Sequence, residues 1–147
     1  MKPLLLIITL TVVLFACKKE SKNPTINNNP KSSLLTFKKW QLTAWKVSPA
    51  FINGDTDFYA SAEPCKNDDY FILSKDSLLT LYENTLKCDP QAPDFYVSKW
   101  FLDSDTLYMW GTPNIIITLD ENSLKTKSFQ KYGSTIYEYN ISYKSIP

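Results

Sequence analysis

Short segments rich in aromatic and β-branched residues recur through residues 34–147, and they constrain the fold more than any other feature. Clusters of Asp, Asn, Ser and Pro separate them, and no long stretch has the 3.6-residue period of an amphipathic helix. This pattern is typical of an antiparallel sandwich or barrel. The expected strands are 40–47, 69–74, 78–82, 95–102, 106–110, 115–119, 124–129 and 134–143. Because most connections are short, an up-and-down order is the simplest topology, and we predict an all-β fold.

Side chains alternate between the two faces of a strand, so each residue can be assigned to one face. The first strand then has Trp40, Leu42 and Ala44 on one face, with Trp45 and Val47 on the other. The sixth strand has Ile115, Ile117 and Leu119 on one face. Large side chains thus occupy both faces of several strands. This indicates either a lined interior with a covered exterior or a surface that packs on something.

The chain begins with the features of an export signal. Met1-Lys2-Pro3 is a short positive start, and residues 4–16 contain eleven apolar residues and two Thr. A membrane-spanning helix needs about 20 apolar residues, so this run is too short to be an ordinary one.

The four residues Leu14-Phe15-Ala16-Cys17 place a small residue directly before a cysteine, and they resemble the lipobox of bacterial lipoproteins. The resemblance implies that residues 1–16 are a lipoprotein signal peptide. It also implies that Cys17 carries fatty acids such as palmitate, which anchor the chain in a membrane. Lys18 rather than Asp follows the cysteine, which favours the outer membrane by analogy with lipoprotein sorting. The alternative is a plain secretory signal followed by a coincidental cysteine.

Residues 18–33 contain one large apolar side chain, Ile26, among Asn, Ser, Lys and Pro. Such a composition cannot build a core, so residues 17–33 are predicted to be a lipidated cysteine with a disordered tether. The folded domain is then residues 34–147.

Two of the three cysteines remain if Cys17 is acylated, namely Cys65 and Cys88. An exported domain meets an oxidising compartment, so a disulfide between them is expected. The alternative, a metal thiolate site, is disfavoured because the chain has no histidine and no CxxC spacing.

The composition excludes several classes of function. A net charge of +1 excludes a broad electrostatic nucleic-acid binder, and three glycines exclude a glycine-rich phosphate loop. Without histidine, no Ser-His or Cys-His nucleophile can form. Asp68 and Asp69 are adjacent, so on a strand they point to opposite faces and cannot easily share a reacting centre. We therefore expect no enzyme, no catalytic residues, no cofactor and no metal site.

Several short motifs of residues 34–147 occur together in one family. These are Trp40-Gln41-Leu42-Thr43, Cys65 before Asp68-Asp69-Tyr70-Phe71, Cys88-Asp89-Pro90, and Lys99-Trp100-Phe101-Leu102 before Asp105-Thr106-Leu107. Together they resemble the lipocalin-like domain family of small bacterial lipoproteins. The chain departs from that family at Lys38-Lys39, where a glycine often precedes the first Trp. The resemblance implies a small antiparallel, lipocalin-like β-barrel, whereas most members have no assigned activity.

Aromatic residues are the candidate ligand-binding site. The side chains that could line an apolar cavity are those of Trp45, Tyr70, Trp100, Trp110 and Tyr139. Equally, a barrel of this size can be filled by its own side chains. Residues 49–66 form the longest irregular stretch and could be a lid, with Phe51, Phe58 and Tyr59 over the cavity. The alternative is a loop packed on the outside.

We therefore expect a non-enzymatic lipoprotein whose barrel binds a small apolar or amphipathic ligand. The alternative is a protein-interaction module, such as an adaptor, inhibitor or accessory subunit, with a filled barrel that binds an envelope protein. In both cases the partners include a membrane, through the N-terminal lipid, and exclude nucleic acid.

Overall fold

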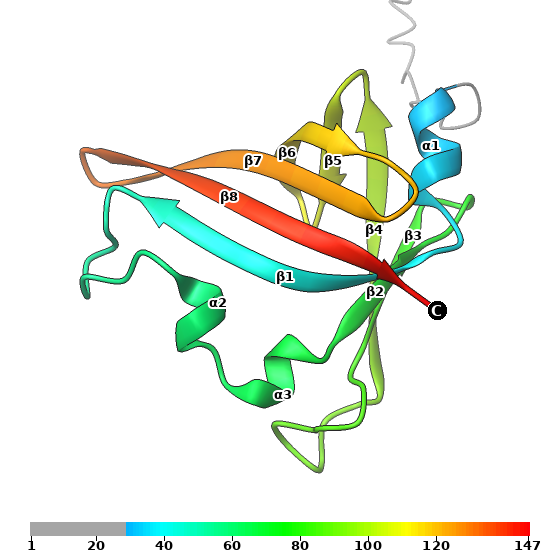
Figure 1. Ribbon diagram of the computed structural model, residues 1–147, viewed down its shortest axis with the longest axis horizontal. Helices are drawn as coiled ribbons and strands as arrows, with labels where there is room; N and C mark the ends of the chain where they lie inside the picture. Colours follow the sequence, from blue (N-terminus) through cyan, green and yellow to red (C-terminus); the bar gives the residue numbers. More distant parts are fainter. Residues whose placement is uncertain (1–28) are drawn as a thin grey trace, which may run out of the picture.

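The computed structural model describes residues 29–147, which form a closed barrel of eight antiparallel strands (Figure 1). Each strand pairs with the next along the chain, and β8 pairs with β1 to close the barrel. The strands are β1 (Lys39–Ser48), β2 (Tyr70–Leu73), β3 (Leu78–Tyr82), β4 (Phe95–Asp103), β5 (Thr106–Met109), β6 (Thr112–Leu119), β7 (Ser123–Tyr132) and β8 (Thr135–Ile146). The predicted all-β up-and-down barrel is confirmed, with strand ends that differ by a few residues. The predicted signal peptide, Cys17 and the tether up to residue 28 lie outside the described residues.

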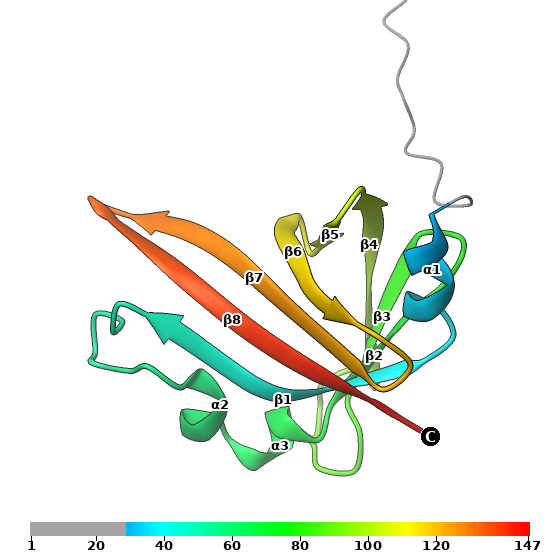
Figure 2. The same cartoon turned by 45° about the horizontal axis from the view of Figure 1, so that its top comes forward.

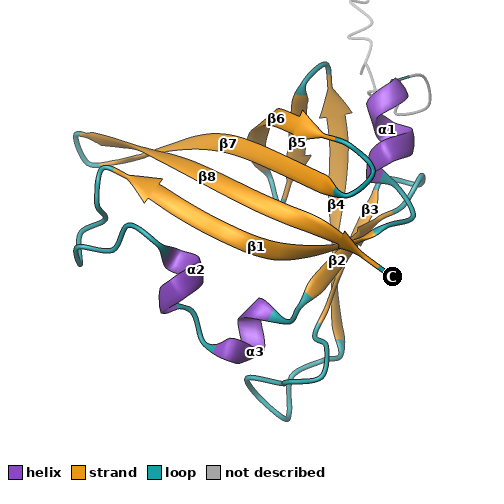
Figure 3. Cartoon of the chain, viewed as in Figure 1, coloured by secondary structure: helices purple, strands orange, loops and turns teal. Residues whose placement is uncertain are grey.

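Three short helices lie outside the sheet, as Figure 3 shows: α1 (Pro30–Leu35), α2 (Phe58–Ser61) and α3 (Pro64–Asn67). Helix α1 covers one end of the barrel, whereas α2 and α3 belong to the connection between β1 and β2 (Figure 1). No helix in residues 29–147 has the length and apolar character needed to cross a membrane.

Helix α1 closes its end of the barrel. The Asn29 side chain caps the helix by accepting the N–H of Lys31 at 3.0 Å, and Leu35 is fully buried. The Trp40 indole N–H donates to the Leu35 carbonyl oxygen at 3.0 Å, so the helix and β1 are joined inside the core.

The helix also shows that the ordered unit begins before Leu34. Residues 30–33, predicted to belong to the disordered tether, are helical here. The Lys31 ammonium group pairs with Asp105 at 2.6 Å, and Asn29 donates to the Ser104 carbonyl oxygen at 3.2 Å. These contacts with the β4–β5 turn explain how a segment with little apolar surface is held in place.

Two β-bulges change the predicted faces of the strands. The register of β1 against β8 shifts between Leu42 and Ala44, so Trp45 and Val47 point to the interior, as Trp40 does. The prediction that Trp45 and Val47 lie opposite Trp40 was therefore wrong, because a bulge inserts one residue into the alternation.

The second bulge lies in β6, between Ile116 and Thr118. Ile115 and Ile117 are exposed, whereas Leu119 packs against the core, so the predicted common face of these three residues was also wrong. Bulges bend a strand, and they are frequent at the rims of barrels.

The core fills the half of the barrel next to α1. Its fully buried members include Leu35, Leu73, Leu79, Trp100, Leu107 and Leu124. Away from α1, β7, β8 and β1 project beyond the other strands in both Figure 1 and Figure 2. Strand β1 pairs with β2 only over Lys39–Gln41, so the rest of its edge is free to receive the β1–β2 connection.

Candidate functional site

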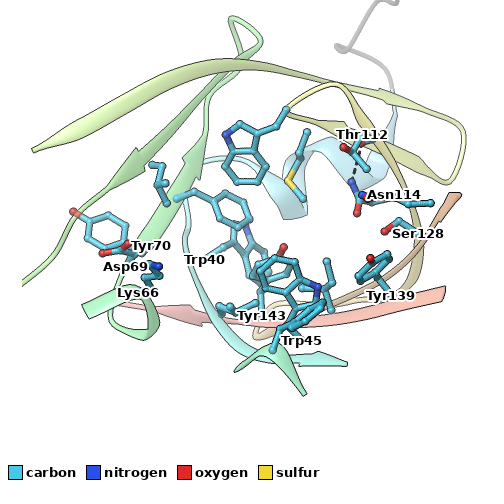
Figure 4. A pocket seen from close by; sticks show the side chains of 18 of the residues that line it. Trp40, Trp45, Lys66, Asp69, Tyr70, Thr112, Asn114, Ser128, Tyr139 and Tyr143 are labelled. Atoms are coloured by element: carbon cyan, nitrogen blue, oxygen red, sulfur yellow. Dashed lines mark hydrogen bonds between the residues drawn. The ribbon is translucent and has the colours of Figure 1, made fainter. Parts of the chain in front are cut away.

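The barrel contains a cavity of about 590 Å³ in the half away from α1. Its floor includes Trp40 and Met109, which are buried, and its rim includes Trp45, Trp110 and Tyr132, which are partly exposed. Figure 4 shows side chains from several strands converging on this space. The barrel is therefore not filled by its own side chains, and the cavity has the size of a typical small-molecule site, about 300–1,000 Å³.

Aromatic rings from the β1–β2 connection cover one side of the cavity. Phe58 lies edge-on to Trp45, with ring centroids 5.3 Å apart, and Phe51 lies edge-on to Phe58 at 5.5 Å. Phe51 also contacts Tyr132 at 5.7 Å, and Phe58 stacks on Tyr139 at 6.2 Å. Phe51 and Phe58 line the cavity, so residues 49–66 lie over the cavity rather than only against the outside. We call this segment the lid.

The lid is attached to the rest of the fold at its middle and near its end. At its middle, Asp57 pairs with the Lys46 ammonium group of β1 at 2.5 Å, and the Thr56 carbonyl oxygen accepts the Val47 N–H at 3.1 Å. The hydrogen bond from Lys46 lowers the pKa of the Asp57 carboxyl group. Near its end, Cys65 forms a disulfide with Cys88 of the β3–β4 connection, as the cysteine count predicted.

Trp110 stands at the rim in a strained turn. Met109 pairs with Thr112, so Trp110 and Gly111 are the two loop residues between β5 and β6. Both have positive φ, 49° and 76°, as a type I′ turn requires. A bulky residue in this region costs about 1–3 kcal/mol, and such strain is found most often at functional sites. The turn directs the Trp110 ring to the cavity, edge-on to Phe71 at 6.0 Å.

Uncharged polar side chains form one wall of the cavity. Asn114, Ser128 and Tyr139 line it and are only 4%, 3% and 5% exposed. They gather on one side of the space in Figure 4, and Asn114 donates to the Thr112 carbonyl oxygen at 2.9 Å. Burial raises the pKa of the Tyr139 hydroxyl, which therefore stays neutral. We call Asn114, Ser128 and Tyr139 the polar wall.

Among the described lining residues, only Lys66 and Asp69 carry a formal charge, and Figure 4 shows both away from the polar wall. Partial burial raises the pKa of Asp69 to about 6, against the opposing effect of the Asn84 N–H that it accepts. The neighbouring Asp68 accepts the N–H groups of Thr85 and Leu86, each at 3.0 Å. Asp68 thus holds the β3–β4 connection rather than sharing a site with Asp69.

The structure brings together most of the aromatic residues selected from the sequence. Those that line the cavity are Trp45, Phe58, Tyr70, Trp110 and Tyr139. Trp100 does not: it is buried in the core, and its indole N–H donates to the Ser74 carbonyl oxygen at 2.9 Å. Tyr59 is also not a lining residue, although it neighbours Phe58 in α2.

The sequence reasoning missed Asn114 and Ser128. They lie at inward-facing positions of β6 and β7, where each is buried. Their neighbours two positions away include the polar residues Thr112 and Thr126, so the alternation of apolar residues that marks an inward face is weak at both positions.

One group of potential metal ligands occurs in the described part of the chain. Its ligand atoms, from Glu63, Cys65 and Cys88, lie within 4.8 Å of one another. Both sulfur atoms are joined in the disulfide, so they cannot bind a metal as thiolates while that bond is intact.

Comparison of the chain with models of protein families, with curated proteins and with solved structures finds no match. The cavity is therefore the feature of this protein that bears most directly on its function.

Proposed function

We propose that this protein is a lipid-anchored envelope protein whose lipocalin-like barrel binds a small apolar or amphipathic ligand without chemical conversion. The observation that carries the proposal is the cavity of about 590 Å³, closed at its base by Trp40 and covered on one side by Phe51 and Phe58. A concave, mainly apolar space with a few polar groups is the usual form of a small-molecule site.

The proposed anchor is an acylated Cys17 in the outer membrane. Its support is the sequence Leu14-Phe15-Ala16-Cys17 after an apolar run, followed by Lys18. Labelling cells with an alkyne analogue of palmitate tests it, with Cys17→Ser as the control. The expected result is a labelled chain in the outer-membrane fraction and an unlabelled variant outside it. An unlabelled native chain would remove the anchor from the proposal.

Ligand binding is tested with N-phenyl-1-naphthylamine, a neutral aromatic probe that fluoresces in apolar surroundings. We expect saturable binding of one probe to the full chain. Leu42 lines the cavity, so Leu42→Trp, which fills part of it, should weaken binding by tenfold or more, on the order of 1.4 kcal/mol. Ile117 is exposed on the outer face, and Ile117→Trp adds a similar ring there without affecting binding. Binding that is absent, or equal in the two variants, contradicts the proposal.

A second candidate function, a protein-interaction module, is favoured by the outer face. Large apolar side chains are exposed there on β4, β6, β7 and β8, namely Phe95, Val97, Ile115, Ile117, Phe129 and Ile136. Exposed apolar patches on soluble domains often mark binding surfaces. Cross-linking in cells, with Ile117→Lys as the comparison, should yield a specific adduct that the variant loses if this candidate is correct.

A further inference from the structure

The polar wall faces the cavity with hydrogen-bonding groups that the protein does not use. The pairing of Ile116 with Thr126, and of Ser128 with Tyr139, puts Asn114, Ser128 and Tyr139 at one level on three adjacent strands. Within residues 29–147, neither the Ser128 hydroxyl nor the Tyr139 hydroxyl has a hydrogen-bond partner. Both residues line the cavity (Figure 4), and neither hydroxyl oxygen is among the fully buried polar atoms without a partner.

An unused polar group in a buried site imposes a requirement on the ligand. A buried donor or acceptor without a partner costs about 1–3 kcal/mol, so an apolar ligand that displaced water from these groups would incur that cost. A ligand with a hydroxyl, carbonyl or amide group at the same place would avoid it. The Asn114 amide can both donate and accept, and a hydroxyl group can do the same.

The charges around the cavity indicate that this ligand group is neutral. The charged lining residues named above, Lys66 and Asp69, both lie away from the polar wall (Figure 4), and Lys66 is largely exposed and pairs with Glu63 at 3.5 Å. Glu138 is paired with Lys127 at 3.0 Å on the outer side of the β7–β8 hairpin. A buried charge without a partner is strongly unfavourable, so a carboxylate or an ammonium group would not be accommodated at the polar wall.

The remaining walls favour a ring rather than a flexible chain. Four large aromatic side chains, those of Trp40, Trp45, Phe71 and Trp110, also line the cavity. Flat rings contact such surfaces over a large area, and aromatic pairs gain about 0.5–1.5 kcal/mol beyond the area that they bury.

From these observations we propose that the cavity selects an uncharged, ring-bearing ligand whose hydroxyl, carbonyl or amide group binds Asn114, Ser128 and Tyr139. This inference rests on the proposed ligand-binding function and specifies the ligand class that the same site takes.

The test is competition against N-phenyl-1-naphthylamine on the full chain at pH 8. The competitors share one ring system and differ in one group: 2-naphthol, naphthalene and 2-naphthoate. We expect 2-naphthol to bind about tenfold more tightly than naphthalene, as one good hydrogen bond allows. We expect 2-naphthoate, which is ionised at this pH, to bind at least about tenfold more weakly than 2-naphthol.

Substitutions in the polar wall then test which side chains cause the preference for 2-naphthol over naphthalene. Ser128→Ala and Tyr139→Phe each remove one hydroxyl, and each should reduce the advantage of 2-naphthol over naphthalene. Part of that reduction should be tighter naphthalene binding, because naphthalene no longer leaves the removed hydroxyl without a partner. The matched control is Tyr108→Phe, because Tyr108 stacks on Phe101 at 4.1 Å and does not line the cavity. Circular dichroism verifies the fold of each variant. If a variant does not fold, the ranking of the three competitors on the unsubstituted chain still tests the proposed ligand class.

The outcomes separate this inference from the proposed function. If the naphthylamine probe does not bind, both are overturned. If it binds but 2-naphthol gains nothing over naphthalene, or 2-naphthoate competes equally well, the ligand class is wrong and the binding function stands.

Discussion

The ring of Phe58 stacks on the ring of Tyr139, with centroids 6.2 Å apart and planes inclined by 23°. One residue belongs to the lid and the other to the polar wall, so the contact joins the cover of the cavity to its hydrogen-bonding side. A movement of Phe58 therefore changes the surroundings of the Tyr139 ring.

Phe58→Ala removes this contact and one ring of the cavity lining. We expect binding of N-phenyl-1-naphthylamine to weaken by roughly tenfold, because the lost ring contacts are worth on the order of 1 kcal/mol. Tyr59→Ala is the control, since Tyr59 is the next residue but does not line the cavity. Fluorescence titration gives both affinities, and an equal loss in the two variants would argue against a role of the lid in binding.

Replacing Trp110 is predicted to weaken ligand binding while changing the stability of the fold little. Asn tolerates positive φ, so Trp110→Asn relieves about 1 kcal/mol of backbone strain, which offsets the lost ring contact with Phe71. The free energy of unfolding should stay within about 1 kcal/mol of its original value, whereas probe affinity should fall about tenfold. Urea unfolding and fluorescence titration measure the two quantities.

Phe37 provides the matched control for Trp110. It has a positive φ of 62° and is 70% exposed, but it lies at the α1 end and does not line the cavity. Phe37→Asn should therefore leave probe binding unchanged. A comparable loss of affinity in this variant would show that strain relief alone, rather than the Trp110 ring, affects the site.

The disulfide should contribute to both stability and binding. Cys65 and Cys88 are separated by 23 positions, and closing a loop of this size contributes about 3 kcal/mol in the chain-entropy model. The double variant Cys65→Ser, Cys88→Ser should unfold at a lower urea concentration and bind the probe more weakly, because the lid loses one attachment. Adding a reductant should reproduce the effect in the native chain and leave the double variant unaffected.

Asp69 should make stability depend on pH between about 4 and 6. The usual pKa of its carboxyl group is 3.8, and burial raises it to about 6 in the folded protein. Between these values the folded state binds more protons than the unfolded state, so stability falls as pH rises through the window and the full cost is present above pH 6. Asp69→Asn should therefore raise the melting temperature at pH 7 and have little effect at pH 4.

Carboxyl groups that are paired in the folded protein make stability depend on pH in the opposite direction. Salt bridges with Lys46 and Lys87 lower the pKa values of Asp57 and Asp94, so their stabilising effect is lost only as pH falls below about 4. The difference between the native chain and Asp69→Asn isolates the Asp69 contribution. A difference in melting temperature that is the same at pH 4 and pH 7 contradicts the assignment.

The sequence determined the strands of this protein, the order in which they pair and the joining of two cysteines. Alternating apolar residues, short polar turns and local backbone preferences are properties of neighbouring residues, so they can be read along the chain. It also indicated that aromatic side chains such as Trp45 and Trp110 could line a cavity, because large side chains occupy both faces of several strands.

Only the tertiary structure decided which rings face the cavity and which fill the core. Trp100 and Trp110 were both predicted to line the cavity, yet one is buried beside Ser74 and the other stands at the rim in a two-residue turn. The bulge after Leu42 turned Trp45 inward, against its expected face. A single inserted residue reverses every later side chain on a strand, and its position depends on the pairing of strands that are distant in sequence.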